Sequence, residues 1–562
     1  MKIFRITNKL EIVRGNKSTE PKYRKEISDL ILDRFGRGPF TSDTVKEILI
    51  FCQNYYINAF EQVCVNESSY TFYKMIFRWH EQSVEIRQSN HFHNLPEGLD
   101  KGYFSCYRRI LKMVLEQGCL VDMLSGEKED LIFRKRIEPI VDDLLYLGEM
   151  IYRFGESIAE QDMVEDISDI TFDLDNLYIQ QRRHHYESIF KYIVTETEKS
   201  KDEFVIDKNA SEDFKIALQG SFGIEYDKML ELLRMLFIHF NLKPGECLSA
   251  YSEHFIKDAI NHTSVVESNL KNFLAGLTLN RDNKMPISEL VRRPHSISRY
   301  LYRPLLQWTV DRKAFYMIGL FIWNEAENNL LLNAIPWGKY PVEWERDKNI
   351  KKYVNRKKDE HDKWLDDAVE DILIGERLQF DRGVKKLVTV KKSYTLMKKG
   401  VGEIDFIIIC PAIKKILVTE CKHLLGRYDM VNWKNDYDHF IGDGKNEGYN
   451  ARIRGKVDWI SQHKEVLEEH FKLKYKATTL SLKEFTIEGI FVINTPTFYM
   501  YNSVFRIYTF HRLKEVITGE YTDPKFSMWV DGGDYTTTYF IKYPYCKNQE
   551  CYIMITRMII AK

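Results

Sequence analysis

Through the first half of the chain, apolar residues recur every three or four positions, which is the spacing of an amphipathic helix. One stripe follows Thr44 and Glu47, whose spacing is that of a helix-capping box. Another stripe runs from Met229 to Phe240. We find no sequence period that repeats along the region, so a stack of repeats is not indicated. The pattern therefore predicts that residues 1–290 form an α-helical region.

The pattern changes near residue 295, where aromatic and β-branched residues flank a polar turn. Residues 299–308 and 314–323 predict the two strands of a β-hairpin, and a short helix is expected at 330–336. We treat 291–345 as a segment that connects the helical region to the rest of the chain.

A charged stretch at 338–360 contains few apolar residues, and we place a domain boundary within it. The domain that follows, 346–562, alternates between the two periodicities in the order helix, three strands, helix, strand. These elements are expected at 363–374, 385–392, 402–410, 415–422, 452–471 and 485–494. Such an order predicts an α/β layer in which helices flank a mixed central sheet. After residue 500 we expect a further helix and edge strands.

Composition narrows the class of protein. A chain of 562 residues is too long for one core and predicts two to four domains. Its formal net charge is zero, so no overall basic field points to nucleic acid, although residues 383–400 hold six lysines and no acid. Nine scattered cysteines indicate reduced thiols. The N-terminal stretch lacks the apolar segment of a signal peptide, and the longest apolar run, at 315–323, is too short for a membrane span. We therefore expect a cytoplasmic protein that does not enter a membrane.

Charged residues interrupt two apolar strands in the stretch GEIDFIIICPAIKKILVTECK. If residues 411–414 form the turn, antiparallel partners have numbers that sum to 825, and Asp405 faces Glu420. Facing side chains lie roughly 4.5–5.5 Å apart at Cβ. Because strand side chains alternate, Lys422 shares a face with Glu420, while Cys421 points away. Three charged groups should therefore converge on one spot.

Two facing carboxylates repel each other unless a cation lies between them. Hard oxygen ligands at this separation suit Mg²⁺ or Mn²⁺, which often share their coordination with a substrate phosphate. Lys422 would orient or deprotonate the attacking water, or stabilise charge that develops on phosphorus. The pattern therefore indicates hydrolysis of a phosphodiester. The competing interpretation is a salt bridge at the edge of a sheet.

The segment from about 346 to 500 resembles the PD-(D/E)xK, or restriction-endonuclease-like, nuclease superfamily. Asp405 matches the aspartate of the motif, and Glu420-Cys421-Lys422 matches ExK. The resemblance implies a restriction-endonuclease-like fold, with Asp405, Glu420 and an acid of the first helix as metal ligands. That acid is Asp366, with Glu370 one helical turn further on as the alternative.

A basic helix face beside such a site would hold a nucleic-acid backbone without reading its sequence. Arg452, Lys456 and His463 are the candidates, together with the lysines of the preceding strand. A solvated charged face is an equally good interpretation of these residues.

The resemblance favours a metal-dependent endonuclease acting on DNA. The helical region would then serve as a sensor, as a regulatory part, or as the contact with a second copy or a partner protein. Host defence against phage is a setting suggested by analogy alone. Two alternatives stay open, namely an inactive nuclease-like protein that binds nucleic acid and a nuclease directed at RNA.

Overall fold

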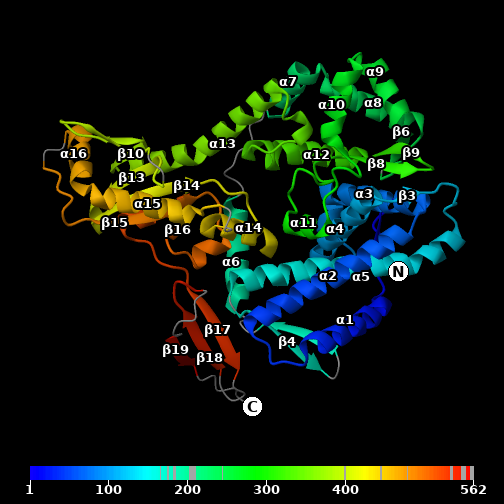
Figure 1. The fold of residues 1–562 in the computed structure, drawn as a ribbon, viewed down its shortest axis with the longest axis horizontal. Coiled ribbons are helices and arrows are strands. Elements are labelled where there is room, and N and C mark those ends of the chain that lie inside the picture. Colours follow the sequence, from blue (N-terminus) through cyan, green and yellow to red (C-terminus); the bar gives the residue numbers. More distant parts are fainter. Residues whose placement is uncertain are drawn as a thin grey trace. The chain divides into compact units, whose positions relative to one another are not determined.

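The computed structural model describes residues 1–164, 166–173, 176–181, 185–200, 210–243, 245–397, 400–442, 446–476, 479–531, 536–545 and 552–556. Its internal contacts divide the chain into two compact units. Unit 1 comprises 1–158, 168–180 and 206–358, and unit 2 comprises 159–167, 181–205 and 359–562. Helices predominate in unit 1, and unit 2 contains a mixed sheet with helices on its faces (Figure 1). None of the described helices is long and apolar enough to cross a membrane.

The boundary between the units lies further along the chain than the sequence pattern predicts. The contacts change at residues 358 and 359, inside α13 (Lys348–Gly375), and the segment 291–345 belongs to unit 1. The charged stretch that suggested a linker is helical from Lys348 onward. Its lysines, glutamates and arginines are good helix formers, and no Pro or Gly interrupts it before Gly375.

Unit 1 is built mainly from helices, as predicted for residues 1–290. They are α1 (Glu20–Phe35), α2 (Ser42–Asn66), α3 (Tyr70–Gln88), α4 (Lys101–Gly118), most of α5 (Leu131–Met163), α7 (Ala210–Phe222), α8 (Tyr226–His239), α9 (Ser252–Thr263), α10 (Glu267–Leu277), α11 (Ile287–Arg292) and α12 (Leu320–Asn333). The helix α2 begins earlier than the sequence suggests. Thr41 is its N-cap and accepts a 3.3 Å hydrogen bond from the N–H of Thr44, so Thr44 is inside the helix.

Short strands accompany these helices. They are β1 (Lys2–Arg5), β2 (Glu11–Arg14), β3 (Asp122–Met123), β4 (Ser168–Asp173), β5 (Asn176–Gln181), β6 (Leu248–Tyr251), β7 (Thr278–Leu279), β8 (Leu305–Val310) and β9 (Lys313–Ile318). The predicted hairpin is present as β8 and β9, which lie in a sheet of order β3-β8-β9-β6. Its turn residues, Asp311 and Arg312, both have positive φ, as tight hairpin turns require.

The hairpin strands are shorter than predicted because a helix begins where the second strand was expected to continue. The buried carboxylate of Glu81, on α3, accepts hydrogen bonds from the N–H groups of Phe321 and Ile322, at 2.6 and 3.1 Å. These are two of the amide groups that the first turn of a helix leaves without a partner. A residue far away in the sequence therefore caps α12, and the local pattern could not reveal it.

Unit 2 contains a five-stranded sheet of order β10-β13-β14-β15-β16. Its strands are β10 (Gln379–Val384), β13 (Ile404–Cys410), β14 (Lys415–Lys422), β15 (Thr486–Ile493) and β16 (Arg506–Thr509). The first two pairings are antiparallel and the last two are parallel, which makes the sheet mixed, as predicted.

Helices cover both faces of this sheet (Figure 1). One face packs against the second half of α13 and α17 (Phe510–Thr518), through Val369, Phe406 and Leu513. The other packs against α15 (Tyr449–Gln462) and α16 (Lys464–Tyr475), through Ile407 and Ile460. These two apolar layers fix the position of each helix along β13 and β14.

Two predicted elements of this unit differ from the structure. The first strand of the sheet is β10, whereas 385–392 lies in the region of a small separate hairpin of β11 (Lys386–Val388) and β12 (Ser393–Thr395). The single helix expected over 452–471 is two helices that meet at His463. The ring of His463 stacks on Trp459 at 4.1 Å, and its Nδ1 lies 2.8 Å from the Trp459 carbonyl oxygen, close to the end of α15.

The remaining helices and strands described for unit 2 precede the sheet strands in the sequence, lie between β14 and β15, or follow β16. They are, in that order, α6 (His185–Ser200), α14 (Met430–Ile441) and a three-stranded antiparallel sheet of β17 (Phe526–Asp531), β18 (Thr536–Ile541) and β19 (Tyr552–Thr556). The helix and additional strands expected after residue 500 are therefore present. The last residues of the predicted segment, 557–562, lie outside the described residues.

Candidate active site

The pairing of β13 with β14 follows the predicted register. The ladder runs from Cys410–Lys415 to Phe406–Thr419, and the numbers of each pair sum to 825. One further step along the same ladder brings Asp405 opposite Glu420. The turn is a short 3₁₀ segment, Pro411–Ile413, which ends at Lys414 in the left-handed conformation.

Asp405 stands at the start of β13 and is tied to the end of β14. Its Oδ2 accepts a 2.8 Å hydrogen bond from the backbone N–H of Cys421. The same oxygen lies 3.8 Å from Nζ of Lys422. Two elements therefore fix the position of this carboxylate, which keeps it close to the ExK segment.

Glu420 is the most buried acid of the site, with a side chain that is 8% exposed. Its Oε2 accepts a 3.2 Å hydrogen bond from Nζ of Lys422. Its Oε1 accepts a hydrogen bond from Nζ of Lys456, which lies on α15 and is equally buried. Strand alternation explains the second contact, because Glu420 shares its face with Ile416 and Val418, which pack against α15.

The charges of the site shift one another. Burial, together with the charge of Glu420, raises the pKa of Asp405 to about 6. Burial lowers the pKa of Lys422, but the carboxylates of Glu420 and Asp405 outweigh it and leave that pKa above its usual value. Lys422 is therefore a firmly charged ammonium. Asp405 is a carboxylate that an additional positive charge would stabilise.

The two acids expected from the first helix, Asp366 and Glu370, have different contacts. Burial raises the pKa of Asp366, which interacts with the side chain of Cys421 and with the charge of Lys422. Glu370 instead forms an ion pair with Arg382, on β10. Arg382 also lies 3.9 Å from Asp366. Asp366 is thus nearer to the candidate site than Glu370, and it approaches from the α13 face of the sheet.

The described residues include no group of three or more His, Cys, Asp or Glu side chains placed to hold a metal ion. The predicted set of Asp405, Glu420 and Asp366 is therefore not assembled as one ligand group. Two of its members, Asp405 and Glu420, do converge. Mg²⁺ is commonly held by one or two carboxylates and keeps several waters. Burial and the charge of Glu420 both raise the pKa of Asp405, and a cation beside the two carboxylates would offset both effects, so this pair fits a hydrated divalent cation.

A histidine pair lies directly behind Lys422. The rings of His361 and His423 stack with their centroids 3.5 Å apart, and Nδ1 of His423 lies 2.9 Å from the carbonyl oxygen of His361. Burial lowers the pKa of His423 to about 3. His423 is therefore a neutral imidazole near pH 7.

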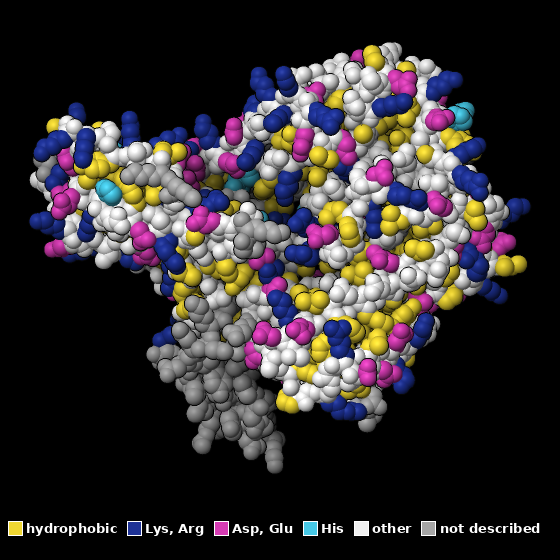
Figure 2. Space-filling model, in the orientation of Figure 1, with side chains coloured by type: hydrophobic (Ala, Val, Ile, Leu, Met, Phe, Trp, Pro, Cys, Tyr) yellow, Lys and Arg dark blue, Asp and Glu magenta, His cyan; other side chains and the backbone are white. Residues whose placement is uncertain are grey.

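The three candidates for nucleic-acid contact have different surroundings. Arg452 is exposed on α15, His463 ends that helix against Trp459, and Lys456 is buried in the site. The lysine-rich hairpin of β11 and β12 packs on α16, where the Val388 N–H donates to Nδ1 of His470 at 3.0 Å. Its described lysines are exposed, namely Lys385, Lys386, Lys391 and Lys392. In Figure 2, Lys and Arg side chains stand along the margin of the part that carries α16 and β10.

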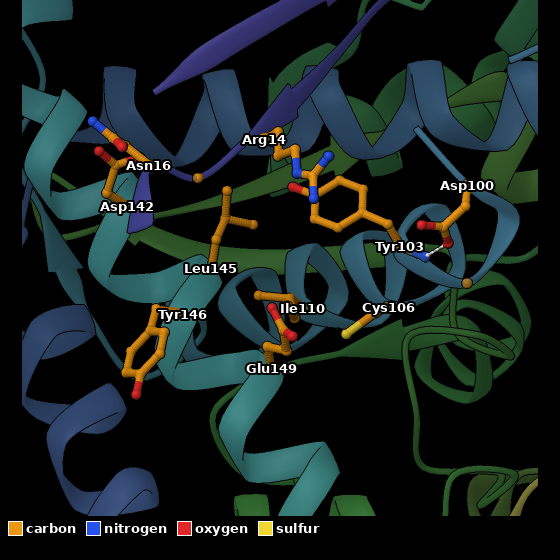
Figure 3. Close-up of a pocket in the computed structure, with 12 residues that line it drawn as sticks. Arg14, Asn16, Asp100, Tyr103, Cys106, Ile110, Asp142, Leu145, Tyr146 and Glu149 are labelled. Atoms are coloured by element: carbon orange, nitrogen blue, oxygen red, sulfur yellow. Dashed lines mark hydrogen bonds between the residues drawn. The ribbon is translucent and has the colours of Figure 1, made fainter. Parts of the chain in front are cut away.

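Unit 1 contains a separate cavity of about 400 Å³, lined by both apolar and charged residues (Figure 3). It lies beside the end of β2, α4 and α5. The guanidinium of Arg14 lies over the ring of Tyr103, 5.2 Å from its centroid, and Glu149 points into the space between α4 and α5. Nothing in its lining corresponds to the acids and lysine of the motif.

Sequence reasoning missed the true surroundings of Lys456 and Arg382. Lys456 was expected on an exposed basic face of the helix, either in contact with nucleic acid or solvated, whereas the structure buries it against Glu420. A helix register with Lys456 on the same side as Ile453 and Ile460 would have placed it against the sheet. Arg382 lies on a strand that the pattern did not predict, so no signal pointed to it.

Comparison of the chain with models of protein families, with curated proteins and with solved structures finds no match to any of them.

Proposed function

We propose that the chain is a metal-dependent endonuclease that hydrolyses phosphodiester bonds of DNA, built on a restriction-endonuclease-like domain in unit 2. The observation that carries the proposal is the convergence of Asp405, Glu420 and Lys422. The nearest oxygens of the two carboxylates lie 3.8 and 3.2 Å from the same ammonium nitrogen. The mixed sheet with helices on both faces is compatible with the fold that the motif implies.

The residues of the chain can be given roles from their surroundings. Asp405 and Glu420 would hold Mg²⁺ or Mn²⁺. When bound, such a cation supplies Lewis-acid stabilisation of charge on phosphoryl oxygens and activates water. Lys422, whose ammonium faces both carboxylates, would orient or deprotonate the attacking water, or stabilise charge that develops on phosphorus. Asp366 favours the charged form of Lys422 from the α13 side.

The exposed lysines of the β11–β12 hairpin and Arg452 supply contacts for a polyanionic backbone. These contacts carry no base recognition, so we expect affinity that falls steeply with salt and depends little on sequence. Host defence against phage remains a suggestion by analogy, as does a sensor role for the helices of unit 1.

The test is cleavage of supercoiled and linear DNA by the full chain, with Mg²⁺, Mn²⁺ or EDTA. We expect metal-dependent cutting that Asp405→Ala abolishes. Asp371→Ala is the matched control, because Asp371 is an exposed acid on α13. Cutting that survives in Asp405→Ala would overturn the assignment. Single-stranded and double-stranded RNA in the same assay would identify an RNA-directed enzyme if RNA alone were cut.

A second candidate function is supported by one observation. Both carboxylate oxygens of Glu420 already accept hydrogen bonds from ammonium groups. Such a neutralised acid is compatible with an inactive nuclease-like protein that binds nucleic acid through its basic surface. This candidate predicts retention of DNA on the protein in EDTA and no cutting with any metal.

A further inference from the structure

Lys456 lies on α15, outside the two strands that carry the motif, and yet it contacts the candidate site. Its ammonium reaches Oε1 of Glu420, and the Lys456 side chain is only 8% exposed. Lys422 takes the other carboxylate oxygen at 3.2 Å. Glu420 is therefore held between two ammonium groups that come from different elements, α15 and the end of β14.

The helix that carries Lys456 is firmly seated. Ile453 and Ile460, one turn on either side, are fully buried. Gly455 allows a loop to approach closely, because a Cβ there would lie 2.2 Å from the carbonyl oxygen of Gly400. A lysine on such a support has little freedom to leave, so its charge is a constant feature of the site.

The charges nearest to the motif can be counted directly. Asp405 and Glu420 contribute two negative charges, and Lys422 and Lys456 contribute two positive charges. These four charges cancel before a metal binds, and Asp366 adds one negative charge from the α13 side of the sheet. One divalent cation makes the site positive, which suits a phosphodiester anion, whereas a second divalent cation would meet three positive centres at short range.

We propose that Lys456 is a positioning residue that holds Glu420 and restricts the site to one divalent cation of modest affinity. The inference rests on the proposed function, since it assumes that Asp405 and Glu420 hold the cation. A purely structural ion pair would contribute to folding and leave metal affinity and stoichiometry unchanged. The two roles are therefore separable by a binding measurement that does not involve DNA cleavage.

The experiment measures binding of Mn²⁺ to the full-length protein by electron paramagnetic resonance, without DNA. Four proteins are compared: wild type, Lys456→Met, Lys456→Arg and Asp405→Ala. We expect one weakly bound ion in wild type and at least tenfold tighter binding in Lys456→Met, with a second ion at high Mn²⁺. Lys456→Arg should restore wild-type binding, because it keeps the charge. Asp405→Ala should lose the ion.

Thermal unfolding followed by circular dichroism accompanies each titration, and Lys456→Gln replaces Lys456→Met if that variant is unfolded. Equal Mn²⁺ affinity and stoichiometry in wild type and in the neutral variant, with loss in Asp405→Ala, would overturn the role of Lys456 and leave the proposed function intact. Absence of Mn²⁺ binding in wild type and in the neutral variant alike would instead overturn the metal site itself, and with it the proposed function.

Discussion

The backbone N–H of Cys421 donates a 2.8 Å hydrogen bond to the carboxylate of Asp405, and this bond joins the start of β13 to the end of β14. It holds Asp405 beside Cys421, the residue that separates Glu420 from Lys422 in the sequence. The convergence of the motif therefore depends on backbone geometry as well as on side chains, and substitutions of the side chains should leave the hairpin in place.

Substitution of Lys422 should separate chemistry from binding. Lys422→Ala removes the ammonium that faces both carboxylates, so we expect cleavage to fall by at least a hundredfold while the fold and DNA affinity are kept. Cleavage rates and fluorescence anisotropy with labelled DNA would measure the two effects. Lys472→Ala is a suitable control, because Lys472 pairs with Glu468 within α16. Full activity of Lys422→Ala would contradict the role given to this residue.

The two acids of α13 should differ in their importance. Asp366→Asn removes a charge that interacts with Lys422, whereas Glu370→Gln only weakens an ion pair with Arg382. We expect the Asp366 variant to lose at least tenfold in cleavage rate and the Glu370 variant to keep most of it. Metal-titrated rates of both variants provide the measurement. A larger loss in Glu370→Gln would assign the helix acid to Glu370.

The cap of α12 predicts a pH-dependent stability of unit 1. Burial raises the pKa of Glu81 to about 8, although the hydrogen bonds from the two N–H groups act in the opposite direction and lower it. Between the ordinary value of 4.5 and about 8, the folded state therefore keeps a proton that the unfolded state has released. The free energy of unfolding should fall as pH rises through this window, by up to ~1.4 kcal/mol per pH unit, and level off above it.

Urea unfolding of wild type and Glu81→Gln at several pH values from 5 to 9 tests this expectation. Glutamine keeps one acceptor for the helix N–H groups and cannot ionise, so its unfolding free energy should vary less with pH. Parallel pH profiles for the two proteins would show that Glu81 does not titrate in this range.

A glycine beside the same carboxylate gives an independent test. A Cβ on Gly319 would lie 2.3 Å from Oε2 of Glu81, with the carboxylate already held by two N–H groups. Gly319→Ala should therefore displace the cap and lower the unfolding free energy by ~2 kcal/mol or more. Thermal or urea unfolding measures it. Gly220→Ala is the control, because nothing lies within 4 Å of a Cβ at that position.

The hairpin that carries the motif could be predicted because the features that determine it lie close together in the sequence. A turn at 411–414 and strict alternation were enough to pair Asp405 with Glu420. The neighbouring strand β10 was not predicted, and Asp381 and Arg382 interrupt the run of apolar residues that would mark it as a strand. In the structure Asp381 and Arg382 are matched by His470, Lys474 and the acids of α13. Such partners are distant in the sequence, so the spacing of apolar residues gives no information about them.

Partners that are distant in the sequence also explain why the sequence pattern did not reveal that Lys456 and Glu81 are buried. Each is an ionisable residue on a helix, and each is buried against polar partners in another element, which are Glu420 for Lys456 and two backbone N–H groups of α12 for Glu81. Burial of a charge is tolerated only where such partners exist. The pairing is therefore a property of the folded arrangement, and it became visible only when β14 and α15, or α3 and α12, were placed together.

The ion pair between Lys456 and Glu420 also bears on how the protein is made. Because the chain supplies its own counter-ion for its most buried motif acid, newly synthesised molecules can complete the sheet and seat α15 without capturing a metal. The β13–β14 hairpin is a local structure, and α15 follows it in the sequence, so both can form as soon as this part of the chain has been synthesised. The chain should consequently fold to a stable, metal-free protein in a chelating medium.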